Sequence, residues 1–405
     1  MHSDLSRLEK PGIRRNDLQH GGGMTPSARL AAAIAVLDRV LAGDPAEKAL
    51  TNWGRASRFA GSGDRAAVRD LVFDALRQRL SAAARGGSMS GRGLVLGLAR
   101  ATGQEALFSG EGHAPTPPGP DEPGREPETD EERMDLPGWL LPDLRASLGN
   151  DLAAVAAAMR FRAPVFLRVN LAKGSVPDAI AALAEDGIGT RTHRLARTAL
   201  EVVDNARKVQ TSRAYLSGLV ELQDASSQAV VEALPLADGM AVLDHCAGGG
   251  GKTLAMAARA KLRLFAHDAA PRRMADLPER AKRAGVTVAL SETPEATAPY
   301  DLVLVDAPCS GSGSWRRDPE GKWRLTEANL ATTVATQAAI LDRAALMVRA
   351  GGVLAFATCS LLDRENGEQV RGFLHRHPGW ALQNELHLTP LQGGDGFYLA
   401  LLHGI

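Results

Sequence analysis

Apolar side chains recur at helical spacing near the start of the chain. Leu30, Ile34 and Leu37 follow one another at intervals of three or four residues, and the stretch from Val68 to Leu80 repeats this spacing. Such a period puts the apolar side chains on one face of an α-helix. Because almost no β-branched run interrupts the pattern, residues 25–108 are predicted to form a small all-helical domain.

From Met240 onward the pattern changes to short apolar runs that alternate with helical stretches. The apolar runs end at Asp244, Asp268, Ser291, Asp306 and Thr358. The helical stretches run from Thr253 to Ala260, from Pro271 to Ala284 and from Thr326 to Ala350. Repeated βα units predict a mostly parallel sheet with helices on both faces, and ligands of such sheets bind outside the carboxyl ends of the strands. Nearly every unusual residue of this chain falls at one of those ends.

Three further segments complete the expected organisation. Residues 1–24 are polar and lack a period, which indicates a flexible tail. Residues 109–135 are rich in proline, glycine and acids, and predict a solvated linker. Residues 136–223 mix short helices and strands, and predict a small α+β domain before the α/β domain of residues 224–405.

Composition excludes several classes of protein. The longest apolar runs fall well short of the roughly 20 residues that span a bilayer. Three cysteines form too few disulfide bonds to stabilise a chain of 405 residues, so it is not a disulfide scaffold. The first 24 residues contain no apolar run of the kind found in secretory signals. We therefore expect a cytoplasmic protein that does not enter membranes.

The charges cancel overall but are unevenly distributed. The chain has 47 basic and 47 acidic residues. Nine acids stand against two bases between residues 111 and 135, whereas ten bases stand against five acids between residues 160 and 213. A neutral total can therefore contain a basic face, and a basic face is what a polyanion such as RNA contacts.

A glycine-rich loop follows the first strand of the α/β pattern. It consists of Cys246, Ala247, Gly248, Gly249, Gly250, Gly251 and Lys252. Successive glycines let the backbone turn sharply and approach a ligand closely. Asp268 follows 17 residues after Gly251, at the end of the next strand, where a carboxylate could accept the ribose hydroxyls of a nucleoside cofactor. A nucleotide triphosphatase loop is excluded because Cys246 stands where its first glycine is needed. A plain turn between strand and helix stays open as the alternative.

Two of the three cysteines stand just past the ends of predicted strands. Cys309 follows Asp306 after the apolar run Leu302 to Val305, and Cys359 follows the run Val353 to Ala357. Spacings of 63 and 50 residues between the cysteines contain no C-x-x-C pair, so we expect no metal site. A pair of thiols beside a nucleoside cofactor instead suggests covalent catalysis.

Methylation of carbon 5 of a pyrimidine requires this combination of groups. Carbon 5 is a poor nucleophile until a thiolate adds to carbon 6, and an acid near ring nitrogen 3 stabilises the adduct. Carbon 5 then attacks a sulfonium methyl group, and a base removes its proton. The residues alone leave open which cysteine is the nucleophile.

Several motifs in the same order resemble the Nop/Sun family of RNA cytosine-5 methyltransferases. The matching stretches are Gln223 to Gln228, Asp244 to Thr253, Asp306 to Gly313, Arg316 to Trp323, Thr358 to Ser360 followed by Glu365-Asn366, and Gly393 to Tyr398. The order of domains is similar to the bacterial branch that methylates 16S ribosomal RNA. The resemblance implies a Rossmann-like class I methyltransferase domain, preceded by a small α+β domain and a NusB-like RNA-binding helical domain.

The resemblance also implies roles for individual residues. Cys359 would attack carbon 6, Cys309 would assist product release, and Asp306 would lie between cofactor and base. The glycine-rich loop and Asp268 would hold S-adenosylmethionine, and Lys252 would contact the base or a charge of the cofactor.

The chain departs from the family pattern at two places. The loop has Gly248 and Gly249 where the family has alanine and proline, and loss of the proline adds ordering entropy on binding, roughly 0.4–1 kcal/mol. Ser291 ends the third strand where the family has an acid near the adenine.

Recognition of RNA is expected from two places. Arg316, Arg317, Lys322 and Trp323 would grip a phosphate and stack a base, and the basic residues of the α+β domain would select the RNA. We expect ribosomal RNA as the partner of a monomeric enzyme. Transfer RNA or 23S ribosomal RNA is the alternative target. A non-catalytic assembly factor and a small-molecule methyltransferase are the alternative classes.

Overall fold

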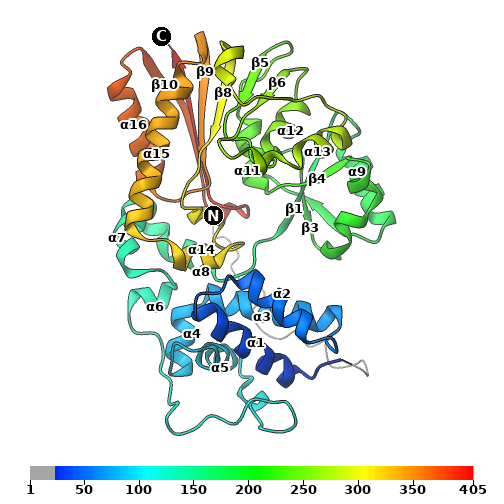
Figure 1. Ribbon diagram of the computed structural model, residues 1–405, viewed down its shortest axis with the longest axis vertical. Coiled ribbons are helices and arrows are strands. Elements are labelled where there is room, and N and C mark those ends of the chain that lie inside the picture. Colours follow the sequence, from blue (N-terminus) through cyan, green and yellow to red (C-terminus); the bar gives the residue numbers. More distant parts are fainter. Residues whose placement is uncertain (1–22, 405) are drawn as a thin grey trace. The chain divides into compact units, whose positions relative to one another are not determined.

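The computed structural model describes residues 23–404, which form two compact units (Figure 1). The helical unit contains the described residues up to Leu141, together with Ala156–Arg162 and Trp315–Arg324. The α/β unit contains Pro142–Val155, Ala163–Ser314 and Leu325 onward. The tail expected over residues 1–24 lies outside the described residues except for Gly23 and Met24.

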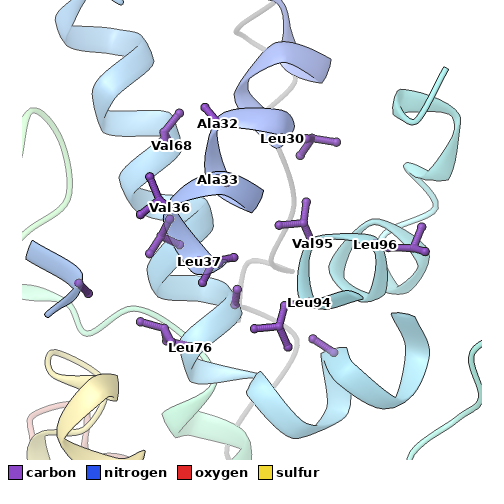
Figure 2. Close-up of a cluster of buried hydrophobic side chains, with 14 of the residues drawn as sticks. Leu30, Ala32, Ala33, Val36, Leu37, Val68, Leu76, Leu94, Val95 and Leu96 are labelled. Atoms are coloured by element: carbon purple, nitrogen blue, oxygen red, sulfur yellow. The ribbon is translucent and has the colours of Figure 1, made fainter. Parts of the chain in front are cut away.

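The helical unit is built from short amphipathic helices around one apolar core. Its helices are α1 (Pro26–Leu41), α2 (Ala46–Ala56), α3 (Ser62–Arg77), α4 (Arg79–Gly86), α5 (Gly91–Ala101), α6 (Asp130–Met134) and α14 (Pro319–Arg324). Figure 2 shows Leu37 of α1 between Val36, Leu76 and Leu94, which come from α1, α3 and α5. The all-helical domain expected here is therefore present, and its likeness to NusB stays a prediction.

Helices α4 and α5 pack with their backbones in close approach. A Cβ atom added to Gly86 would lie 1.7 Å from the carbonyl oxygen of Gly93. Likewise, a Cβ atom on Gly97 would lie 1.9 Å from the carbonyl oxygen of Ala82. A Cβ atom on Gly91 or Gly93 of α5 would also lie within 2.3 Å of a carbonyl oxygen, that of Ile34 or Ser88. Only glycine fits at these positions, which explains why three glycines occur in α5 despite their low helix propensity.

The acidic segment after α5 packs along the helical unit rather than standing free as a spacer. Arg92 Nη2 donates to Glu122 at 2.8 Å, and Arg85 Nη2 donates to Glu126 at 3.0 Å. The hydrogen bond from Arg92 lowers the pKa of Glu122 to about 2. Arginines on α4 and α5 thus hold the acids, which the apolar pattern of the sequence could not indicate.

Asp135 ends the acidic segment as a fully buried carboxylate. Its oxygens accept hydrogen bonds from the backbone nitrogens of Leu80 and Ser81, at 3.0 and 2.9 Å, and so cap the N-terminus of α4. Arg160 forms an ion pair with the same carboxylate at 2.6 Å. One side chain therefore connects three segments of the helical unit.

The α/β unit contains two sheets. A four-stranded antiparallel sheet has the order β2-β3-β1-β4, and a seven-stranded sheet has the order β10-β11-β9-β8-β5-β6-β7. The strands of the small sheet are β1 (Val165–Val169), β2 (Thr190–Thr192), β3 (Ala199–Val202) and β4 (Val220–Leu222). The strands of the large sheet are β5 (Ala241–Asp244), β6 (Arg263–Ala266), β7 (Ala289–Leu290), β8 (Tyr300–Asp306), β9 (Val348–Thr358), β10 (Trp380–Leu388) and β11 (Phe397–Gly404).

Helices cover both faces of the large sheet (Figure 1). The helices of this unit are α9 (Val176–Glu185), α10 (Arg213–Leu216), α11 (Ala225–Glu232), α12 (Gly251–Ala257), α13 (Leu277–Ala284), α15 (Glu327–Ala345) and α16 (Gly367–Arg376). Helices α7 (Leu141–Leu148) and α8 (Leu152–Met159) each have residues in both units. Alternate strand residues face opposite sides: Leu243 packs with α15 and α16, whereas Val242 packs with α11 and α12. This alternation confirms the doubly covered, mostly parallel sheet.

The boundaries of the elements differ from the expectation near the end of the chain. Helix α15 ends at Ala345 and β9 begins at Val348, whereas one helix was expected as far as Ala350. Strands β10 and β11, which run antiparallel to their neighbours, were not expected. Strands β5, β8 and β9 end at the expected residues Asp244, Asp306 and Thr358.

Within residues 23–404, no helix combines the length and apolar character needed to cross a membrane. The same residues contain no group of three or more His, Cys, Asp or Glu side chains arranged to hold a metal ion. All three cysteines are free thiols.

Replacement of Asp135 by alanine should destabilise the helical unit strongly. The change removes the ion-pair partner of Arg160 and the hydrogen-bond acceptor of the backbone nitrogens of Leu80 and Ser81. The free energy of unfolding should therefore fall by about 3 kcal/mol. Urea unfolding measures this difference. The exposed Asp121→Ala is the matched control, and a similar loss in both variants would contradict the role of Asp135.

Candidate active site

The carboxyl ends of β8 and β9 bring two cysteines together. The parallel register pairs Asp306 with Ala357, so the loops that follow both strands leave the same edge of the sheet. Cys309 Sγ lies 3.4 Å from Cys359 Sγ, and both side chains are partly exposed. The prediction that the two thiols share one cleft therefore agrees with their separation.

The electrostatic surroundings distinguish the two thiols. Either sulfur can be the donor in the contact between them, but the contact lowers the pKa of Cys359, so Cys309 is the donor when Cys359 is ionised. The charge of Lys252 also lowers this pKa, whereas burial and the charge of Asp306 raise it. The same contact and burial raise the pKa of Cys309 well above its usual value. The thiolate is the nucleophilic form of cysteine, so Cys359 is the better nucleophile of the pair.

Lys252 and Asp306 form an ion pair next to the thiols. Lys252 Nζ donates to Asp306 Oδ2 at 2.7 Å, and the Lys252 side chain is only 9% exposed. Burial disfavours the charge of Lys252, but the adjacent Asp306 carboxylate outweighs it and raises the pKa of the lysine. The lysine nitrogen also lies 4.9 Å from the ring centroid of Phe397, a contact that favours its charged form. The site therefore holds a buried lysine, paired with an aspartate, beside the two thiols.

The glycine-rich loop connects β5 to α12 and is held from several sides. Gly250 has φ +77°, and a Cβ atom there would lie 2.2 Å from Leu277 Cδ1, so only glycine fits. The backbone nitrogen of Gly248 donates to Asp268 at 3.0 Å. Arg280 donates to the carbonyl oxygen of Gly249. These contacts order a loop that lacks the family's proline.

Asp244 offers an unused acceptor beneath the same loop. Its Oδ2 accepts from Thr253 Oγ1 at 2.6 Å, whereas its buried Oδ1 has no hydrogen-bond partner among the described residues. Burial raises the pKa of Asp244 to about 7. Together with Asp268, this places carboxylate acceptors around a backbone cradle, which is the donor and acceptor set that a nucleoside cofactor needs.

The remaining predicted cofactor residues lie around this cradle. Burial raises the pKa of Cys246 to about 12, so this thiol is not nucleophilic at neutral pH. Ala247 bonds through its backbone nitrogen to the carbonyl oxygen of His267 at 2.9 Å. Ser291 bonds through its backbone to Ala266, at the end of β6 and beside Asp268. A contact between Ser291 and an adenine stays a prediction.

Sequence reasoning assigned no role to Glu365, which the structure buries completely between the two cysteine loops. Its carboxylate accepts hydrogen bonds from the backbone nitrogen of Ser310 at 2.7 Å and from Ser360 Oγ at 2.5 Å. Gln337 of α15 donates to it at 3.2 Å. Glu365 stands in one of the motifs that carry the resemblance, which was the available signal. Gln337 lies inside a helix and gave no signal.

The residues expected to grip RNA belong largely to the helical unit. Lys322 is 2% exposed, and its nitrogen donates to the carbonyl oxygens of Arg77 and Asp135 at 3.1 and 2.6 Å. Trp323 Nε1 donates to the carbonyl oxygen of Leu76 at 2.7 Å. The bonds to Leu76 and Arg77 satisfy carbonyls that the end of α3 leaves without helical partners.

Lys322 thus has a packing role that differs from the expected one, whereas Trp323 is half-buried and its stacking on a base stays a prediction. Arg316 is also buried, and its carbonyl oxygen accepts from Arg77. Arg317 is exposed, so a contact between Arg317 and RNA stays a prediction.

The basic surplus of residues 160–213 is substantially neutralised by ion pairs. The pairs are Arg160 with Asp135, Arg162 with Asp70, Arg191 with Glu201, Arg197 with Glu232, and Arg213 with Glu185 and Asp186. Arg168 is buried and donates to Gln223 at 2.6 Å. The expected basic face is therefore weaker than the sequence count indicates.

Known families match most of the α/β unit. Residues 231–402 match the family described as 16S rRNA methyltransferase RsmB/F, and residues 136–210 match the ferredoxin-like domain of RsmF/B-like methyltransferases. Both matches agree with the domains and the family resemblance inferred from the motifs.

Curated relatives carry the name ribosomal RNA small subunit methyltransferase B. The protein from Citrobacter koseri is 31% identical over 291 residues, which cover 68% of each chain. The protein from Serratia proteamaculans is 32% identical over 66% of each chain. The one from Xanthomonas campestris is 36% identical over 59% of this chain and 57% of its own length. The match thus spans about two thirds or less of these relatives.

Solved structures confirm the fold. The crystal structure titled PH0851 has a TM-score of 0.74 at 22% identity, and covers 94% of this chain and 99% of its own. A methyltransferase homologue from Pyrococcus horikoshii has a TM-score of 0.60 at 24% identity, with 68% and 97% of the two chains covered.

Removal of the Cys309 thiol should raise the pKa of Cys359. The variant Cys309→Ala loses the S–H donor that stabilises the Cys359 thiolate, so the pH at half-maximal alkylation of Cys359 by iodoacetamide should rise by about one unit. Peptide mass spectrometry reads Cys359 separately from Cys246. An unchanged or lower midpoint would contradict the hydrogen bond from Cys309 as its cause.

Proposed function

Since this chain belongs to the RsmB/F family of 16S rRNA methyltransferases, we propose that it methylates carbon 5 of a cytosine in 16S ribosomal RNA, with S-adenosylmethionine as cofactor. The observation that carries the proposal is the separation of 3.4 Å between the Cys309 and Cys359 sulfur atoms beside the Lys252–Asp306 pair. A methyltransferase that acts on oxygen or on an exocyclic nitrogen has no need of two thiols in one cleft.

Cys359 acts as the nucleophile in this proposal. Its sulfur forms a bond to carbon 6 of the cytosine, and the displaced ring electrons move to nitrogen 3, which takes up a proton. In the proposal Asp306, at the end of β8, is the acid that hydrogen-bonds nitrogen 3 and gives it this proton. The charge of Lys252 favours the Cys359 thiolate before attack.

S-adenosylmethionine, when bound, supplies an electrophilic methyl group for carbon 5. The residues that would hold it are the loop Cys246 to Lys252, Asp268 and Ser291. After methyl transfer a base removes the proton from carbon 5, and the bond between Cys359 and carbon 6 breaks with its electron pair returning to sulfur. In the proposal Cys309 assists this release, and its contact with Cys359 and its burial raise its pKa.

The target base must leave its stack to reach the thiols, because the neighbouring bases of a stack cover the ring face that the sulfur attacks. We propose that Arg317 and the exposed basic side chains of the small sheet contact phosphates of the RNA. The enzyme is proposed to act as a monomer in the cytoplasm, where ribosomal RNA is made.

The proposal is tested by transfer of labelled methyl from S-adenosylmethionine to unmodified 16S ribosomal RNA, with bisulfite sequencing of the product. One protected cytosine is the expected result. If only transfer RNA or 23S ribosomal RNA is labelled, the proposed substrate is wrong but the proposed reaction stands. Absence of both incorporation and cofactor binding by calorimetry would favour a non-catalytic assembly factor.

The two cysteines should give opposite phenotypes. Cys359→Ala removes the nucleophile, so methyl incorporation should fall by at least a thousandfold. Cys309→Ala should leave RNA covalently attached, because release of the product is impaired, and the adduct should appear as a shifted band on a denaturing gel. A shifted band with Cys359→Ala instead would reverse the two roles.

A further inference from the structure

The segments after the two cysteines meet at one buried carboxylate. Ser310 directly follows Cys309, and Ser360 directly follows Cys359. Both serine hydroxyls donate to Glu365 Oε2 at 2.5 Å, and the backbone nitrogen of Ser310 donates to Glu365 Oε1 at 2.7 Å. The position of each sulfur atom thus depends on a neighbour that Glu365 holds.

The groups that contact Glu365 are hydrogen-bond donors. Ser310 contributes an N–H and an O–H, Ser360 contributes an O–H, and Gln337 contributes an N–H of its amide. Four donors converge on two oxygens, so both oxygens of the carboxyl group serve as acceptors. A neutral amide of the same size offers one acceptor atom and must turn its own donor toward one of these groups.

The negative charge of Glu365 has no counter-ion close by. Among the residues that the structure describes, no Lys, Arg or His nitrogen is recorded within 4.0 Å of its oxygens. The side chain is 0% exposed, so water does not screen it either. The charge of Glu365 therefore disfavours the thiolate of Cys309, in addition to burial and the contact with Cys359.

We propose that Glu365 is a positioning residue for the methyl transfer, which holds the two cysteine loops in register and keeps Cys309 protonated as the hydrogen-bond donor to Cys359. The hydrogen bonds set the relative position of the loops. The charge adds to the contact with Cys359 and to burial, all of which favour the protonated form of Cys309.

Further contacts keep the carboxylate between the loops. Thr358 Oγ1 donates to Asn366 Oδ1 at 2.5 Å, and Asn366 Nδ2 donates back to the carbonyl oxygen of Ser360 at 3.0 Å. Gln337 also donates to the carbonyl oxygen of Pro308, at 2.8 Å. Asn366 therefore fixes Glu365 to the end of β9, and Gln337 fixes it to the Cys309 loop.

The test compares Glu365→Gln with Glu368→Gln. Both variants lose one negative charge from neighbouring positions, but Glu368 is exposed and Glu365 is buried. In the full-length protein, the alkylation rate of each cysteine by iodoacetamide is followed against pH by peptide mass spectrometry. This measurement needs no RNA and no turnover, so it reports on Glu365 even if the proposed function, on which the inference rests, fails in the methyl-transfer assay.

In Glu365→Gln the alkylation midpoint of Cys309 should fall by about one pH unit, because a nearby negative charge is lost. The midpoint of Glu368→Gln should equal that of the unchanged protein. Methyl transfer by Glu365→Gln should fall at least tenfold, with cofactor binding retained. An unchanged Cys309 midpoint in a folded Glu365→Gln protein would overturn the proposal, whatever its activity.

Should Glu365→Gln fail to fold, Ser310→Ala and Ser360→Ala carry the test. Each removes one hydroxyl that ties a cysteine loop to the carboxylate, and neither changes the charge. The limiting alkylation rate at high pH should rise several-fold for Cys309 in Ser310→Ala and for Cys359 in Ser360→Ala. Unchanged rates in both variants would overturn the role of Glu365 in holding the loops.

Discussion

The parallel pairing of β8 with β9 is the constraint on which the site depends. Asp306 lies opposite Ala357, and the backbone nitrogen of Ala307 bonds to the carbonyl oxygen of Ala357 at 2.9 Å. A slip of one residue would turn every side chain of a strand to the other face. The apolar alternation that fills both faces of the sheet therefore also fixes where each cysteine loop begins. Core packing and catalytic geometry are two results of the same register.

The sequence predicted the parts of the site that follow strand ends. Asp244, Asp306 and Cys359 could be placed because apolar runs end beside them, and parallel strands bring such ends to one edge. Glu365 could not be given a role in the same way, because its function comes from two serines that approach it only in the folded chain. The interpretation of Lys322 as an RNA contact was wrong for a related reason. A lysine in a polar segment is expected to be exposed, and its buried carbonyl partners come from distant parts of the chain.

The order of the two cysteines shows what local structure adds to a family resemblance. Motifs assign Cys359 as the nucleophile by resemblance, whereas the structure offers a physical reason, the hydrogen bond between the two thiols. Two chemically identical side chains thus have pKa values shifted in opposite directions by their surroundings. These shifts favour the order that the resemblance implies, which stays a prediction.

The helical unit is discontinuous in the chain, and this affects how it is made. Its buried Trp315 and Lys322 come from a segment that ends at Arg324, more than 180 residues after the unit's first part ends at Leu141. During synthesis, the first helices emerge long before the segment that completes their packing. The helical unit therefore stays incompletely packed until most of the α/β unit has been translated.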